Sequence, residues 1–188
     1  MIRSFVVVIV CVCATLAALS AQSAPPAAAA GASNQMLLAL VGHIEKQLTG
    51  VAAEMPEDRY TFAPTTGAFR GVRTFAEQLK HAAAANHLAA ATLLDERVTA
   101  DMAAERGPDD VKTKTQVLQY LGESFAALKR AAATVNDNNA FAPIKGPFGP
   151  ATNSRVGAIV AALIHSSNHY GQLVEYLRLN GLVPPKVL

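Results

Sequence analysis

Ile164-His165-Ser166-Ser167-Asn168-His169-Tyr170-Gly171-Gln172-Leu173 is a stretch that carries two histidines four positions apart. It lies in a segment without proline between residues 156 and 180, which predicts one long helix. On an α-helix four residues advance by about 400°, so the imidazoles of His165 and His169 lie roughly 40° apart on one face. Such a pair can supply two ligands to a metal ion, and at least one further ligand must then come from another helix.

The face that the two histidines share continues through small residues, Ala158, Ala161 and Ala162, and past the pair to Gln172. Small side chains leave room for a bound ligand. The alternative is that the pair closes the solvated end of an apolar stripe, because a helical histidine is more often a surface or hydrogen-bonded core residue than a ligand. The spacing alone leaves both interpretations open.

The first 23 residues have the composition of a secretory signal peptide. Arg3 supplies one positive charge, residues 5–19 form an uncharged apolar run, and small residues follow up to Ala24. The apolar run is shorter than the roughly 20 residues that a membrane-spanning helix needs. We therefore expect residues 1–23 to be removed on export, which places the mature protein in the periplasm or outside the cell without a stable membrane span. An uncleaved N-terminal anchor is the alternative.

Composition narrows the chemistry of the mature chain. Cys11 and Cys13 both fall inside the apolar run, so cleavage leaves no disulfide, thiolate ligand or cysteine nucleophile. The formal net charge is +2 and becomes +1 without Arg3. No nucleic-acid partner is expected, because nucleic-acid-binding domains usually show a clustered basic face. Residues 24–33 are Ala, Pro, Gly and Ser, which predicts a flexible leader ahead of one folded domain at residues 34–188.

Four segments with helical patterning follow the leader. Apolar residues spaced by three and four predict a first helix that begins at Asn34 and stops before Pro56. The second helix begins with the capping box Thr74-Phe75-Ala76-Glu77 and runs to about residue 95 or 97. Pro108-Asp109-Asp110 predicts the start of a third helix, which runs to about residue 135. The fourth helix is expected over residues 153–180.

The absence of an alternating strand pattern makes the expected fold class all-α, a four-helix bundle. The first half of the last helix, residues 156–164, is apolar on every side and is therefore expected at the centre. Residues 136–150 form a long connection that can fold over one end of the last helix, as a lid or as surface packing.

The two ends of the domain resemble a known family. The similarity to the last helix of the DinB-like superfamily rests on His165, His169-Tyr170-Gly171-Gln172-Leu173 and Tyr176-Leu177-Arg178-Leu179-Asn180-Gly181-Leu182-Val183-Pro184-Pro185, and Thr74-Phe75-Ala76-Glu77-Gln78-Leu79-Lys80-His81 resembles its second-helix motif. The resemblance implies an up-down-down-up four-helix bundle with a divalent ion held by three histidines, which match His81, His165 and His169. One position departs from the pattern, because Asn168 is often acidic in similar sequences.

Three histidines leave at least one coordination position for water or substrate, which is typical of catalytic metal sites. Zinc is the default ion, and nickel or iron also suits three nitrogens. Groups that support the ligands are expected at Glu77, one turn before His81, and at Asn168 and Gln172. His87 is not expected to join them, because it is six residues from His81, a rotation of about 240°.

The function implied by the resemblance has two main forms. Some members of the superfamily are metal-dependent transferases or isomerases that use a low-molecular-weight thiol, which the ion would bind and activate. Such thiols are mainly cytoplasmic, so an exported transferase or hydrolase is expected to act on another small molecule unless the family analogy extends to the thiol. The alternative is a non-catalytic exported module that binds a metal or a small ligand. A structural bundle whose histidines bind nothing is a third hypothesis, and a homodimer is a further open question.

Intact-mass measurement of the exported protein tests the predicted signal peptide. The charged start, short apolar run and small-residue end predict a mature chain that begins near Ala24. A mature mass that retains Met1 would indicate an anchor or a cytoplasmic protein, and would strengthen the hypothesis of thiol chemistry.

Overall fold

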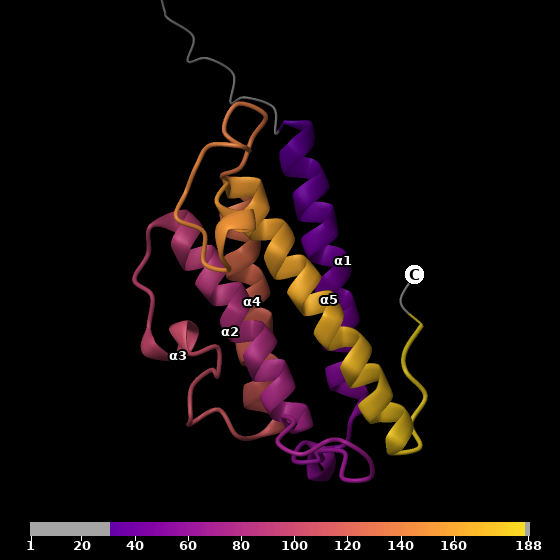
Figure 1. Cartoon of the computed structure of the whole chain (residues 1–188). Coiled ribbons are helices and arrows are strands. Elements are labelled where there is room, and N and C mark those ends of the chain that lie inside the picture. The colour runs from indigo at the N-terminus through magenta and orange to yellow at the C-terminus, as the bar shows by residue number, and fades with distance from the viewer. Residues whose placement is uncertain (1–30, 187–188) are drawn as a thin grey trace, which may run out of the picture.

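The computed structural model describes residues 31–186, so the predicted signal peptide and most of the predicted leader lie outside the described residues. Four long helices form the bundle in Figure 1: α1 (Ala32–Glu54), α2 (Phe75–Leu94), α4 (Lys114–Ala133) and α5 (Arg155–Leu179). Shorter turns of helix are η1 (Glu57–Arg59), α3 (Ala100–Ala103) and η2 (Pro150–Thr152). No strand occurs within residues 31–186, and the predicted all-α class is confirmed.

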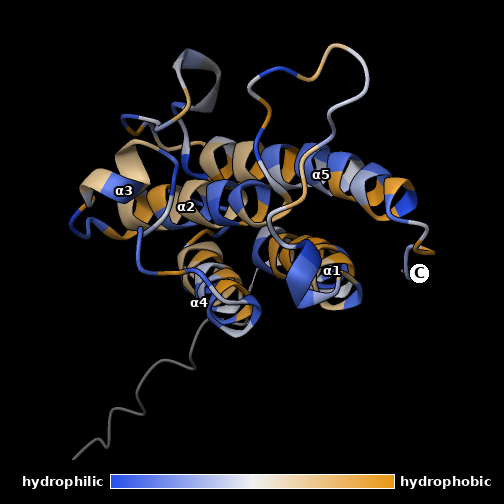
Figure 2. Cartoon of the chain, turned by 90° about the horizontal axis from the view of Figure 1, so that it is seen from below, coloured by the Kyte–Doolittle hydropathy of each residue, from blue (hydrophilic) through white to orange (hydrophobic). Residues whose placement is uncertain are grey.

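Each long helix packs mainly against two others. Seen from below, α2 lies beside α5 and α4 lies beside α1, and the two pairs stack on each other (Figure 2). At one end of the bundle, Lys114 Nζ donates hydrogen bonds to the carbonyl oxygens of Ala53 and Met55, at 2.6 and 2.8 Å. At the other end, Asn34 Nδ2 donates to the carbonyl of Ala132 at 3.1 Å. The start of α4 therefore meets the end of α1, and the two helices run antiparallel.

The helix starts follow local capping chemistry. At α2, Thr74 Oγ1 accepts a hydrogen bond from Glu77 N, and Glu77 Oε2 accepts one from Thr74 N, so the predicted capping box is present. The predicted start of the third helix at Pro108 is wrong. A second capping box, Thr113 with Gln116, satisfies the backbone donors instead and starts α4 at Lys114. Residues 108–111 form a turn.

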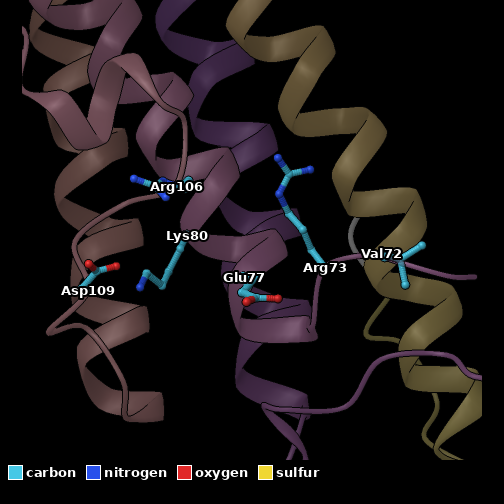
Figure 3. A pocket seen from close by; sticks show the side chains of 7 residues that line it. Val72, Arg73, Glu77, Lys80, Arg106 and Asp109 are labelled. Atoms are coloured by element: carbon cyan, nitrogen blue, oxygen red, sulfur yellow. The ribbon is translucent and has the colours of Figure 1, made fainter.

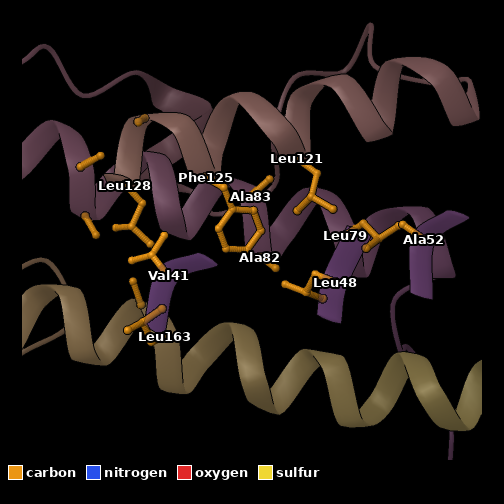
Figure 4. Close-up of a cluster of buried hydrophobic side chains, with 14 of the residues drawn as sticks. Val41, Leu48, Ala52, Leu79, Ala82, Ala83, Leu121, Phe125, Leu128 and Leu163 are labelled. Carbon is orange, nitrogen blue, oxygen red and sulfur yellow. The ribbon is translucent and has the colours of Figure 1, made fainter. Parts of the chain in front are cut away.

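The core is apolar and dense in alanine. Large side chains from α1, α2, α4 and α5 meet in the core. In Figure 4, Phe125 of α4 lies close to Ala82 and Ala83 of α2. Most of the α2 alanines are buried, namely Ala82, Ala83, Ala84, Ala85, Ala89, Ala90 and Ala91. Because alanine adds only one carbon beyond the backbone, it lets neighbouring helices approach α2 closely while keeping its helix propensity high.

The expectation that residues 156–164 lie at the centre of the bundle holds for only one face of this segment. Ile159 and Leu163 are buried, but Val160 is 36% exposed and Ile164 is 66% exposed. A bundle of two layers leaves every helix one face to solvent, and α5 is no exception. No helix of residues 31–186 has the combined length and hydropathy that a membrane span requires.

A truncation at the centre of the core should measure how far the fold depends on it. Phe125 is fully buried, so Phe125→Ala should lower the free energy of unfolding by about 3–5 kcal/mol, through lost burial and the cavity left behind. Denaturant titration followed by circular dichroism measures this change.

Phe141→Ala is the matched control, because Phe141 is 84% exposed and its truncation should change stability by less than about 0.5 kcal/mol. Equal effects of the two substitutions would contradict the packing described above.

Candidate metal centre

Three histidines from two helices converge on one point. His165 Nε2 on α5 lies 2.9 Å from His81 Nε2 on α2 and 2.7 Å from His169 Nε2. One ring nitrogen from each of the three lies within 4.8 Å of the others. His81 and His169 are each 7% exposed, and His165 is half-buried. The structure thus brings together all three residues that the sequence predicts as metal ligands.

Polar contacts on both sides of the histidines fix the register of α2 against α5. Toward the start of α2, Gln78 Nε2 donates to Gln172 Oε1 at 2.8 Å. In the other direction, Ser166 Oγ donates to Asn86 Oδ1 at 3.1 Å in the buried interior, and Asn86 Nδ2 donates to Ser124 Oγ of α4 at 3.4 Å. A buried polar group is costly without a partner, so these contacts disfavour other alignments of the two helices.

The connection before α4 orients His81. The Nδ1–H of His81 donates to the backbone carbonyl of Glu105 at 2.7 Å, and a carboxylate oxygen of Glu105 lies 3.6 Å from the same nitrogen. A proton on Nδ1 leaves the Nε2 lone pair facing the other two rings. Metal-ligating histidines usually have such a partner on the second nitrogen. Sequence analysis missed Glu105, because its acceptor is a main-chain atom that every residue carries.

Burial keeps the three imidazoles neutral. It is the main cause that lowers the pKa of His169, to about 3, and the neighbouring His165 and His81 lower it further. Burial also lowers the pKa of His165, with His81 as the next cause. For His81 burial again lowers the pKa, although the hydrogen bond to Glu105 opposes the shift. Neutral imidazoles are the form that coordinates a metal ion.

The three Nε2 atoms are better suited to coordinating a cation than to hydrogen bonding with one another. A neutral imidazole carries a single N–H, and that of His81 already points at Glu105. The Nε2 atoms of the cluster therefore face one another with too few hydrogens to satisfy every lone pair. A tetrahedral zinc ion with Zn–N distances of about 2.0–2.1 Å needs nitrogens about 3.3 Å apart, so a small outward movement of the rings accommodates it.

A family model described as the DinB superfamily matches residues 42–173, a range that includes all three histidines. The chain belongs to the DinB superfamily. The crystal structure of a conserved protein from Enterococcus faecalis has the same fold, with a TM-score of 0.62 and 15% sequence identity over 80% of this chain and 98% of that one. No curated protein matches the chain. The predicted resemblance to the DinB family is confirmed.

The predicted supporting residues of this DinB-superfamily chain have other contacts. The Glu77 carboxylate accepts the Thr74 backbone N–H at 2.7 Å, and Gln172 pairs with Gln78. Asn168 is exposed. Among the hydrogen bonds of residues 31–186, none joins these side chains to the three imidazoles, and their support of the ligands stays a prediction. His169 Nδ1 is buried and has no hydrogen-bond partner in the same range.

The other two histidines lie elsewhere. The ring of His87 packs against Tyr120 of α4, with 5.1 Å between ring centroids, and burial lowers its pKa. His43 is exposed on α1. Neither belongs to the group of candidate ligands among the described residues.

One aromatic ring lies beside the cluster, and two pockets lie near it without a histidine of the cluster in their lining. Phe148, from the connection before α5, lies 6.2 Å from the ring of His165, so this connection does reach the site. A largely apolar pocket of about 320 Å³ includes Gln78 and Gln172, each one helical turn from a candidate ligand. A polar pocket of about 530 Å³ lies along the start of α2 (Figure 3). Each pocket has room for a small molecule, which would reach an imidazole only by extending beyond the residues that line the pocket.

Acid should destabilise the metal-free protein in a window set by these histidines. The pKa of His169 is about 3 in the folded chain, against an ordinary value of 6.5, because burial and His165 disfavour its charged form. Between these two values the unfolded chain binds a proton that the folded chain does not. The free energy of unfolding should therefore fall as pH falls below 6.5 and level off near 3.

Denaturant titrations in chelator at neutral and mildly acidic pH measure this dependence. His169→Gln removes the most strongly shifted imidazole and should reduce the slope of stability against pH. A variant as acid-sensitive as the wild type would contradict the assignment.

Proposed function

We propose that the chain holds a divalent metal ion through His81, His165 and His169 and presents it to a small molecule. The observation that carries the proposal is the convergence of three neutral Nε2 atoms from α2 and α5, separated by 2.7 and 2.9 Å in two of the pairs. Buried polar atoms require partners, and one cation can serve all three lone pairs at once. Membership of the DinB superfamily supports the same proposal.

Zinc is the ion we propose, since three imidazoles with an open fourth position are a common zinc site. Nickel and iron are the alternatives, because both accept nitrogen ligands. The described ligand group contains neither carboxylate nor thiolate. The ion's full charge is therefore available to a bound water or substrate.

The proposed activity is that of a metal-dependent transferase or hydrolase acting on a small molecule. When bound, the ion would lower the pKa of a coordinated water or thiol and so supply a nucleophile at neutral pH. The chain's own residues would position the substrate: Gln78 and Gln172 offer amide groups at the wall of the apolar pocket, and the ring of Phe148 lies 6.2 Å from that of His165.

A non-catalytic metal- or ligand-binding module is the second candidate, and the carboxylates near the cluster favour it. The Glu77 carboxylate is engaged in the cap of α2. The Glu105 carboxylate lies on the Nδ1 side of His81, away from the converging nitrogens. Neither is placed as a general base beside the candidate ion, so catalysis depends on what the ion itself activates.

We also propose that the chain is exported. The composition of residues 1–23 supports this proposal, and these residues lie outside the described range. Homodimer formation is a further open proposal. Val160 and Ile164 form an exposed apolar surface on α5 where substitutions would test it by size-exclusion chromatography.

Metal analysis of protein purified without a histidine tag tests the site. The wild type should carry about one ion per chain, and His81→Ala, His165→Ala or His169→Ala should each remove most of it, because two imidazoles make a much poorer site. His87→Ala is the matched control on α2. It should keep the stoichiometry, since His87 packs against Tyr120.

The melting temperature gives an independent readout. A metal that binds only the folded state raises it by mass action, so a chelator should lower it at neutral pH and have less effect in mild acid. A chain without bound metal whose melting curve is indifferent to chelator would leave only the hypothesis of a structural bundle.

A further inference from the structure

The polar pocket along the start of α2 is lined by three basic side chains. Arg73 comes from the loop before α2, Lys80 from α2 itself, and Arg106 from the connection before α4 (Figure 3). Glu77, Asp109, Gly71 and Val72 complete the lining. We call this the basic pocket. Its volume of about 530 Å³ exceeds that of a single inorganic ion and lies within the range of small-molecule sites.

The three basic side chains have no acidic partner. The ion pairs of residues 31–186 involve other cations, for example Lys129 with Glu45 and Arg130 with Glu96. No hydrogen bond from the side chains of Arg73, Lys80 or Arg106 occurs in the same range of residues. The carboxylate within their reach on α2, that of Glu77, accepts the Thr74 backbone N–H. The basic pocket therefore gathers cations whose hydrogen-bond donors are free.

The basic pocket adjoins the histidine cluster. Lys80 directly precedes His81, and Arg106 directly follows Glu105, whose carbonyl binds His81. The guanidinium of Arg73 points up between α2 and α5 in Figure 3, and its positive charge is a minor cause of the lowered pKa of all three cluster histidines. These links place the basic pocket near the histidine cluster, although no histidine lines it.

Charge counting points to the sign of that ligand. The lining of the basic pocket holds three basic side chains and two carboxylates, those of Glu77 and Asp109, and therefore has one net positive charge. The candidate ligands are neutral imidazoles, so a divalent ion bound to them would add two further positive charges nearby. An anionic ligand restores the balance, and guanidinium groups recognise carboxylate and phosphate oxygens in a fixed, two-pronged geometry.

We infer that the basic pocket binds an oxyanion group, carboxylate or phosphate, of the small molecule whose other end reaches the histidine cluster. The inference deepens the proposed function, and its second half rests on that function. The oxyanion contact itself needs only Arg73, Lys80 and Arg106.

Calorimetric titration of inorganic phosphate and of succinate into metal-free protein at low ionic strength tests the inference. Both should show saturable binding at millimolar concentrations. Arg73→Gln or Arg106→Gln should each weaken it about three- to tenfold, through loss of one charge-assisted contact. Tighter phosphate binding would identify a phosphorylated ligand, and tighter succinate binding a carboxylated one.

Arg70→Gln is the matched control. Arg70 lies three residues before Arg73 in the same loop, is exposed, does not line the pocket and changes the net charge equally. It should bind both anions like the wild type. No saturable binding of either anion, or equal weakening by Arg70→Gln and Arg73→Gln, would overturn the inference. Circular dichroism confirms that each variant is folded.

The metal content of the same proteins separates this inference from the proposed function. Arg73→Gln and Arg106→Gln should keep the wild-type metal stoichiometry. A wild type that takes up no metal but binds phosphate through Arg73 and Arg106 would refute the metal site and leave the oxyanion contact standing. A wild type that binds metal but neither anion would refute the oxyanion contact and leave the metal site standing.

Discussion

The close antiparallel packing of α2 on α5 is the contact on which the candidate site depends. It sets His81 of one helix opposite His165 and His169 of the other, and a slip of one helical turn, about 5.4 Å, would separate them. The buried alanines of α2 allow the close approach. The pairs Gln78–Gln172 and Asn86–Ser166 hold the alignment. Packing thus fixes the distance between the helices, and buried polar groups fix their register.

The connection between α2 and α4 links the two parts of the site. It runs down the outside of the bundle in Figure 1 and carries α3. Glu105 and Gly107 both have positive φ there, at 50° and 71°, and a Cβ at Gly107 would lie 3.0 Å from Tyr120 Cε1. This backbone geometry aims the Glu105 carbonyl at His81 and places Arg106 and Asp109 in the basic pocket. One segment therefore orients a candidate ligand and shapes the neighbouring pocket.

Sequence reasoning predicted the parts of this structure that local periodicity encodes. Helical spacing predicted the four long helices and the shared face of His165 and His169, while His81 was assigned through the family motif. Pro108 misled the prediction of α4, because a proline followed by two carboxylates suits a turn as well as a helix start, and the choice was made by Thr113 and Gln116. The contact of the Glu105 carbonyl with His81 could not be predicted, since a main-chain acceptor has no sequence signature. The exposure of Val160 and Ile164 depends on how many layers surround α5, which composition does not specify.

Charge ties the candidate metal site to the basic pocket. The three imidazoles contribute no negative charge, so a bound cation would be left to attract an anion from outside the chain. When a cation site and an anion site lie side by side, binding of either ion raises the affinity for the other by the same factor, as linkage requires. This factor is largest for one molecule that contacts both sites, because solvent screens the attraction between ions that lie apart at the surface. The difference between an enzyme and a binding module in this chain then lies in the molecule that fills the open coordination position, because both functions need the same helices, histidines and cations.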